Sequence, residues 1–163
     1  MPRNVARRLA CAKAQAVAEI VPDALVLGAD TVVARGRRVL PKPADEDEAR
    51  RCLVLLSGGR HRVHGGVAVA APGGRIRVRV AVTIVTFKRL SADEVDRYLA
   101  SGEWRGKAGG YAVQGRAAAF VRQITGSYSN IVGLPLFETC ALLQGLGHGC
   151  PASSGTAADD ADR

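Results

Sequence analysis

Asp30 and Lys42 are the first residues in this sequence whose types and positions could serve chemistry. Asp30 lies late in the short apolar run of residues 24–33, which is typical of a buried strand whose carboxyl end faces a ligand. A carboxylate is costly to bury there unless it binds a metal, pairs with a cation or accepts hydrogen bonds. We therefore interpret Asp30 as a candidate functional acid, with a turn-forming or capping aspartate as the alternative.

Two of the four lysines in the sequence have unusual surroundings. Lys42 lies between Pro41 and Pro43, which restrict the backbone and direct the side chain. Lys107 opens a glycine-rich stretch that ends at Gly115. A fixed ammonium group suits a phosphate oxygen, and a solvated loop lysine is the alternative at either position.

Amide and hydroxyl side chains follow these glycines. Gln114 is expected on a strand, where its amide could pair with the edge of a nucleobase or with the backbone. Ser127 and Ser129, with Asn130, could line a phosphate or form a turn. Glycines allow a backbone to approach a ligand closely, so the whole segment favours a phosphorylated small molecule.

The histidines and cysteines do not predict a built-in metal centre. His61 and His64 would face opposite sides of a strand, and we interpret them as ordinary polar strand residues. The four cysteines have no metal-clip spacing, and Cys11 and Cys52 are expected to be reduced thiols among apolar neighbours.

Composition indicates one globular domain, because the chain has 163 residues of which 47% are hydrophobic. No apolar run reaches the roughly 18 residues of a membrane span, and no signal peptide is recognisable, so a soluble cytoplasmic protein is expected. The net charge of +8 would attract polyanions. Nucleic-acid binding is the less favoured alternative, since the arginines are scattered and aromatic residues make up only 4%.

Apolar periodicity predicts an α/β fold with a mixed sheet and flanking helices. Helices are expected at residues 4–20, 45–57, 91–101 and 135–144. Strands are expected at 24–33, 39–40, 61–71, 75–87 and 111–124, the last with a break at Gly115. Residues 72–74 would turn the hairpin, and the Gly-, Ser-, Ala- and Asp-rich residues 147–163 are expected to be disordered.

Three apolar stripes follow from these patterns. The first helix would bury Val5, Leu9, Ala12, Ala16 and Ile20, and the second would bury Ala49, Cys52, Leu53 and Leu56. The second hairpin arm would place on one face Ile76, Val78, Val80, Val82 and Ile84.

Five segments occur in a recognisable order, and they are Ala29–Val33, Pro41–Pro43, Leu56–Gly58 with His61–Val63, Trp104–Gly115 and Gly126–Leu136. With these segments the sequence closely resembles the Maf family of nucleoside triphosphate pyrophosphatases, from about residue 2 to residue 146. The segment Lys107–Gly115 resembles the dTTP/UTP branch of the family, and not the 7-methyl-GTP branch.

The resemblance implies an α/β fold related to inosine triphosphatase, with a cleft between two lobes. It implies cleavage of a nucleoside triphosphate into a monophosphate and pyrophosphate, with a divalent metal such as Mg²⁺ or Mn²⁺. By position, Asp30 matches the proton acceptor and is a candidate metal ligand, while Thr31 and Gln114 match base-selecting residues. Lys42 and Lys107 match basic residues of the cleft, and Ser127 is a candidate substrate contact.

The resemblance also sets expectations about what departs from the family. Its members begin with a strand and a Ser-x-x-Arg-Arg loop, whereas this sequence starts in the helix that follows. If that loop is truly missing from the protein, we expect weak or no turnover, and a misassigned start is the alternative. Gly65 stands where the family usually carries threonine. A catalytically inactive nucleotide-binding or regulatory member is therefore the alternative function, and a homodimer is a candidate assembly.

Overall fold

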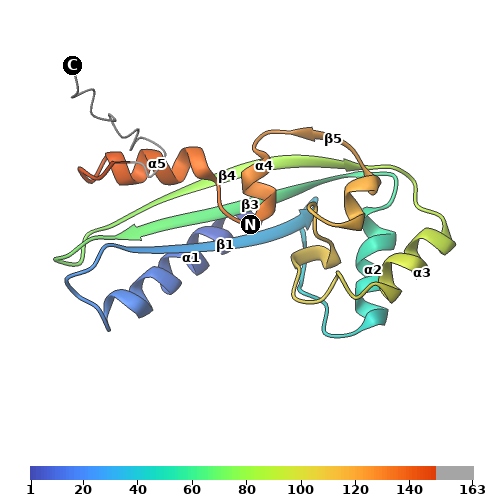
Figure 1. Cartoon of the computed structure of the whole chain (residues 1–163), viewed down its shortest axis with the longest axis horizontal. Helices are drawn as coiled ribbons and strands as arrows, with labels where there is room; N and C mark the ends of the chain where they lie inside the picture. Colours follow the sequence, from blue (N-terminus) through green and yellow to red (C-terminus); the bar gives the residue numbers. More distant parts are fainter. Residues whose placement is uncertain (150–163) are drawn as a thin grey trace, which may run out of the picture.

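A five-stranded sheet forms the centre of the computed structural model, which describes residues 1–149 (Figure 1). Its strand order is β2-β1-β3-β4-β5, and the strands are β1 (Val26–Arg35), β2 (Arg38–Leu40), β3 (Arg60–Ala70), β4 (Ile76–Phe87) and β5 (Val121–Thr125). The helices are α1 (Pro2–Ala18), α2 (Glu46–Leu56), α3 (Ala92–Ala100), η1 (Ala108–Gly110), η2 (Arg116–Phe120), α4 (Tyr128–Val132) and α5 (Leu136–Gln144). The α/β class is confirmed, and the strand pairs within this part of the chain are all antiparallel where a mixed sheet was expected.

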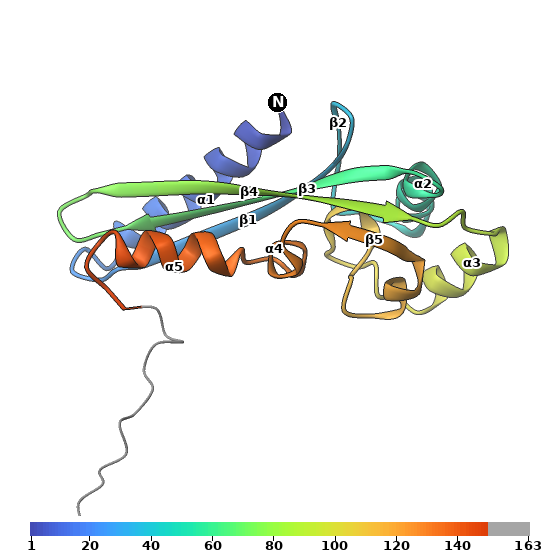
Figure 2. The ribbon, with the colours of Figure 1, turned by 90° about the horizontal axis from the view of Figure 1, so that it is seen from above.

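Helices cover the two faces of the sheet at its hairpin end. Figure 2 shows α1 on one side of β1, β3 and β4 and α5 on the other. On the α1 side, Ala10 and Ala14 pack against Ala68 and Ala70 of β3. On the α5 side, Leu142 packs against Val67 and Val69.

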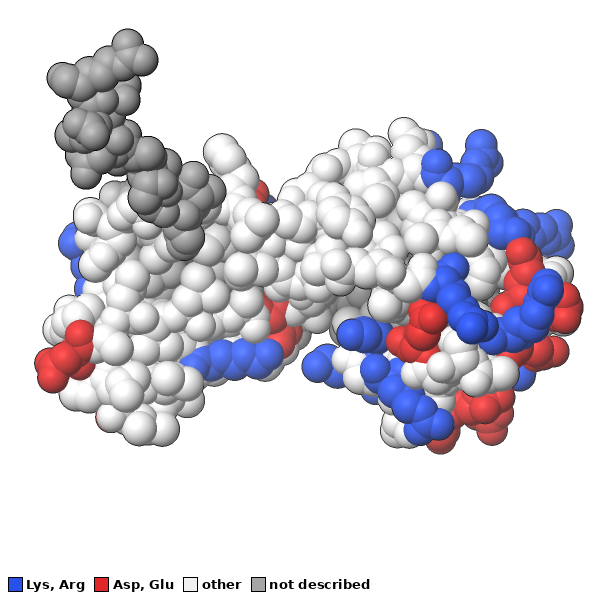
Figure 3. Space-filling view, in the orientation of Figure 1, with Lys and Arg blue, Asp and Glu red and all other residues white. Residues whose placement is uncertain are grey.

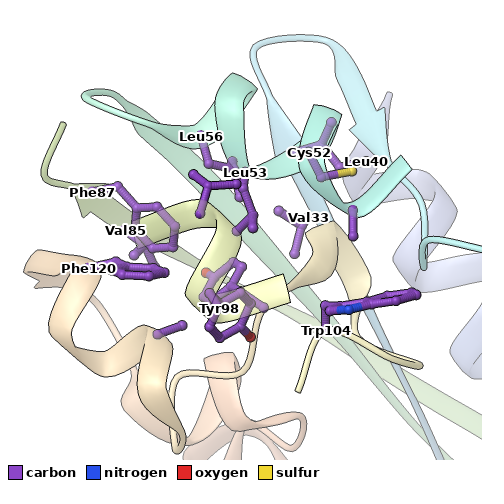
Figure 4. Close-up of a cluster of buried hydrophobic side chains, with 14 of the residues drawn as sticks. Val33, Leu40, Cys52, Leu53, Leu56, Val85, Phe87, Tyr98, Trp104 and Phe120 are labelled. Atoms are coloured by element: carbon purple, nitrogen blue, oxygen red, sulfur yellow. The ribbon is translucent and has the colours of Figure 1, made fainter. Parts of the chain in front are cut away.

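The opposite end of the sheet carries the larger core, which Figure 4 shows in close-up. The apolar face of α2 is buried there, through Ala49, Cys52, Leu53 and Leu56, as its periodicity predicted. The Asp45 carboxylate accepts a hydrogen bond from the Glu48 backbone amide at 2.7 Å and so caps the helix. Two lobes result, and Figure 3 shows them joined by a narrower waist.

The expected stripe of α1 was wrong. The helix buries Pro2, Ala6, Ala10 and Ala14, whereas Leu9 is 37% exposed and Ile20 is 78% exposed. The reason is close packing, since a Cβ on Gly66 would lie 2.3 Å from the Ala6 carbonyl oxygen. Only small side chains fit between backbones that approach this closely, so hydrophobicity alone selected the wrong face.

The expected face of β4 was only partly right. Ile76 and Val78 pack towards α1, but the fully buried positions further along are Thr83, Val85 and Phe87 on the other face. The strand changes its buried face because α1 covers one side at the hairpin end, while the core around α2 covers the other side at the far end.

The last strand prediction was too long. Strand material with a break at Gly115 was expected over residues 111–124, whereas the structure has a turn at residues 113–115, the 3-10 helix η2 and then the short strand β5. Glu103 holds this irregular segment, because its carboxylate accepts a hydrogen bond from the Arg116 amide at 2.8 Å. For the expected disordered tail, residues 150–163 lie outside the described residues.

Candidate active site

A cavity of about 240 Å³ opens between β1, the segment that follows β2, the glycine-rich loop and α4. Its lining residues are Lys13, Ala29, Asp30, Thr31, Val33, Lys42, Val63, Gly106, Ala108, Tyr111, Ile131, Val132 and Gly133. The cavity therefore contains three of the six candidate residues predicted from the sequence.

Asp30 and Thr31 reach the cavity from β1. They pair with Gly66 and Gly65 of β3, which fixes the register of this part of the strand. The side chain of Asp30 is only 14% exposed. A carboxylate this far from water needs a partner, and it has one in Lys13.

Lys13 extends from α1 towards the middle of β1. Its Nζ lies 2.6 Å from Asp30 Oδ1 and 3.3 Å from the Ala29 carbonyl oxygen. The lysine side chain is 53% exposed, so it lies at the open side of the cavity. The close packing of α1 on Gly28 and Gly66 brings this lysine over the strand.

Lys13 was missed by the sequence analysis, although a signal for it existed. Like Lys42 and Lys107, it is one of only four lysines in an arginine-rich chain. The fourth, Lys88, forms an ion pair with Glu94 outside the cavity.

Lys42 lines the cavity from an irregular segment between β2 and α2. The preceding residue, Pro41, accepts a hydrogen bond from the Gly109 amide at 2.9 Å, so the lysine segment is attached to the glycine-rich loop. This contact joins two parts of the chain that are 68 positions apart and that periodicity could not connect.

The other three predicted residues lie outside the lining. Lys107 is exposed, although both of its chain neighbours line the cavity. Gln114 is exposed on the turn, and not on a strand as expected. The Ser127 hydroxyl accepts a hydrogen bond from the Asn130 amide at 3.2 Å and caps α4, which agrees with the turn alternative.

The two histidines face opposite sides of β3, as expected, and both are buried. His61 Nε2 lies 2.8 Å from the hydroxyl of Tyr111, a cavity residue. Burial, with a smaller contribution from Arg35, lowers the pKa of His61 to about 4. Burial also lowers the pKa of His64, so both imidazoles favour the neutral form near pH 7.

The side chains that line the cavity fit a divalent metal that is bound jointly by one carboxylate and by the phosphates of a substrate. Residues 1–149 contain no group of three or more His, Cys, Asp and Glu side chains that could hold an ion. Asp30 is the one carboxylate among the lining residues. Mg²⁺ is commonly bound by one or two carboxylates together with substrate phosphates, and Asp30 satisfies that requirement.

An acid and two lysines that line one cavity are an arrangement suited to phosphoryl chemistry, because they combine a proton acceptor with cations for phosphate oxygens. Comparison with known proteins agrees with that class. The model of the family described as "Maf-like protein" matches residues 1–146, and the chain belongs to this family.

Curated relatives make the likeness more specific. A protein of Rhodospirillum rubrum is 62% identical over 148 residues, which are 91% of this chain and 70% of the relative. A protein of Paramagnetospirillum magneticum is 65% identical over 147 residues, covering 90% and 77%. One of Sphingopyxis alaskensis is 60% identical, with the same coverage. All three are named dTTP/UTP pyrophosphatase.

A membrane-spanning role finds no support in the helices of residues 1–149, since none is both long and apolar enough to cross a bilayer.

Proposed function

We propose that this protein hydrolyses nucleoside triphosphates, dTTP and UTP among them, to the monophosphate and pyrophosphate. The observation that carries the proposal is the placement of Lys13, Asp30 and Lys42 on one cavity. The names of relatives that are 60–65% identical over about nine tenths of the chain support the choice of substrate.

Asp30 is the proposed proton acceptor. A water molecule attacks the α phosphorus and forms a new P–O bond, while its proton passes to the Asp30 carboxylate. The bond from the α phosphorus to the bridging oxygen breaks, and pyrophosphate leaves with its electrons. In the structure Lys13 Nζ lies 2.6 Å from Asp30 Oδ1, so the carboxylate is already paired with this lysine. We expect the triphosphate to draw the half-exposed Lys13 ammonium towards its own oxygens, which frees Asp30 to accept the proton.

Lys13 and Lys42 are proposed to neutralise phosphate oxygens from two sides. Lys107 remains a third candidate, because the segment that carries it borders the cavity. Mg²⁺ or Mn²⁺, held by Asp30 and the phosphates, would supply further neutralisation of charge. At about 240 Å³ the cavity is smaller than the roughly 300–1,000 Å³ of pockets that enclose whole ligands, so it would hold the reacting phosphates and leave part of the nucleotide outside.

Base selection is proposed for Thr31, which lines the cavity, and for Gln114, which would have to meet a part of the nucleotide that extends beyond it. Ser127 is proposed to act on substrate only through α4, whose last residues border the cavity. A cytoplasmic location and a homodimer belong to the same proposal, and light scattering of the purified protein would report the assembly.

Product analysis tests the reaction. The purified protein is incubated with UTP, dTTP, CTP, ATP or GTP and Mg²⁺, and the products are separated by anion-exchange chromatography. We expect UMP or dTMP together with pyrophosphate, and slower reaction of the purine nucleotides. Formation of the diphosphate and orthophosphate would contradict the proposed bond cleavage, whereas nucleotide binding without products would support an inactive nucleotide-binding protein.

A further inference from the structure

Tyr111 connects the cavity with a buried residue that lies outside it. Its side chain is 5% exposed and borders the cavity at the end of the glycine-rich loop. Its hydroxyl lies 2.8 Å from Nε2 of His61, which is 2% exposed on β3. The two rings meet edge to face at 5.4 Å, and the His61 ring meets Phe87 in the same way at 5.0 Å.

The glycine-rich loop is held against the sheet by close backbone approach. A Cβ on Gly109 would lie 2.9 Å from a methyl group of Val33, and one on Gly110 would lie 3.2 Å from the Pro43 ring. The Gly109 amide also donates to the Pro41 carbonyl oxygen at 2.9 Å. The loop thus contacts the residues on both sides of Lys42, which itself belongs to no helix or strand.

The His61–Tyr111 hydrogen bond has a preferred direction. His61 is neutral near pH 7, so its ring carries one proton. Nδ1 is buried and has no hydrogen-bond partner among residues 1–149. A buried N–H without an acceptor is rarer and more costly than a bare lone pair, which favours the proton on Nε2. His61 Nε2 then donates its proton to the Tyr111 hydroxyl oxygen, and this bond holds the tyrosine against β3.

We propose that His61 is a positioning residue for the active site, acting through Tyr111. The hydrogen bond sets where the glycine-rich loop lies on the sheet, and the loop in turn sets where Lys42 enters the cavity. The catalytic consequence rests on the function proposed above, whereas the structural consequence for the loop does not.

Hydrogen exchange of the Gly109 amide tests the structural part without any ligand. In the purified full chain, Tyr111→Phe and His61→Phe remove one partner each. We expect exchange at Gly109 to become at least about tenfold faster, while amides in the centre of β3 keep their rates. Unchanged exchange at Gly109 in both variants would overturn the proposal, whether or not the protein hydrolyses nucleotides.

A mutant cycle tests the catalytic part. Tyr111→Phe is expected to lower kcat/KM for UTP roughly tenfold, and to have little further effect when Lys42→Ala is already present, because both act at one position. The matched control is Tyr98→Phe, which removes another buried hydroxyl that bonds the neighbouring Ala112 amide at 3.3 Å but lines no part of the cavity.

The outcomes separate positioning from stability. Equal losses of kcat/KM in Tyr98→Phe and Tyr111→Phe, or fully multiplicative effects of Tyr111→Phe and Lys42→Ala, would reduce His61 and Tyr111 to a structural role. If the wild-type protein releases no pyrophosphate, the proposed function fails, and the same cycle is read from the dissociation constant of UTP. Absence of UTP binding as well would remove the catalytic part and leave the exchange result to decide the structural one.

Discussion

The two sides of the cavity are built in different ways. On one side, Lys13 and Asp30 stand on a long helix and a central strand, and their functional groups are charged. On the other side, Gly106, Ala108 and Tyr111 lie on an irregular loop that contributes backbone and apolar surface. The regular elements supply the proton acceptor and one lysine, whereas the loop supplies surface for a substrate and contacts the irregular segment that carries Lys42.

The forces that hold the two sides differ accordingly. The strand and helix are fixed by ladder pairing and by backbone-to-backbone packing at Gly28 and Gly66. The loop is not part of the sheet, and it relies on close approach at Gly109 and Gly110 and on a few hydrogen bonds, among them Gly109–Pro41 and His61–Tyr111. A change on the first side should therefore affect the chemical step, and a change on the second should affect geometry more than chemistry.

The largest effect is expected from Asp30→Asn, which keeps the shape and removes the proton acceptor. We expect kcat for UTP to fall by about a thousandfold, since general base catalysis contributes on the order of 10²–10⁴. Asp23→Asn, at an exposed position before β1, is the matched control and should keep wild-type turnover. If Asp30→Asn still releases pyrophosphate in a metal-dependent reaction at the wild-type rate, Asp30 is not the proton acceptor.

Acid should weaken the loop side through His61. Its pKa is about 4 in the folded protein and about 6.5 when unfolded, so the unfolded state takes up a proton first as the pH falls. The contribution of neutral His61 to the free energy of unfolding is fully present above pH 6.5. It is lost as the pH falls towards 4, and the loss amounts to at most about 3 kcal/mol. Urea denaturation at several pH values should show this loss in the wild type and a shallower dependence in His61→Phe. Identical pH profiles would mean that His61 titrates normally.

Lys42→Ala should lower kcat/KM for UTP by roughly a hundredfold, because a charged hydrogen bond to phosphate contributes about 1.5–3 kcal/mol. Lys107→Ala should cost less, since the Lys107 side chain lies outside the lining. Lys88→Ala serves as the control, because Lys88 pairs with Glu94 away from the cavity. A larger loss in Lys107→Ala than in Lys42→Ala would shift the phosphate contacts to the loop side.

Gly28→Ala probes the packing beneath the charged side. The added Cβ would lie 2.6 Å from both the Ala10 carbonyl oxygen and the Ala14 amide nitrogen, so α1 would have to move. We expect the free energy of unfolding to fall by about 1–3 kcal/mol, as in other overpacked cores. In the control Gly145→Ala, the nearest atom is 3.3 Å away, and the stability should change little. Equal stability of both variants would contradict the close packing of α1.

Local sequence patterns correctly predicted the elements whose position depends on a single apolar face or on a turn. The α2 stripe and the hairpin around residues 72–74 follow from periodicity and turn chemistry, and the structure confirms them. The α1 stripe failed because the fit of alanine against glycine outweighs the hydrophobicity of Leu9 and Ile20. No local pattern in α1 reports which strand residues will be glycines beneath it.

Site residues could be predicted where the residue type differs from that of its sequence neighbours. Asp30 stands out in an apolar strand and Lys42 between prolines, and both line the cavity. Lys13 lies in an ordinary amphipathic helix, and its meeting with Asp30 depends on how the helix crosses the sheet. The exposed position of Gln114 depends likewise on contacts of Glu103 with the turn, which sequence spacing does not reveal.

The most direct measurement is the dissociation constant of a UTP analogue with a non-hydrolysable link between the α and β phosphates. Calorimetry would compare the wild type with Lys13→Met, Lys42→Ala and the double variant. We expect each lysine variant to bind at least about tenfold more weakly and the double variant to show coupling. Unchanged affinity in both lysine variants would contradict a single triphosphate held between these residues.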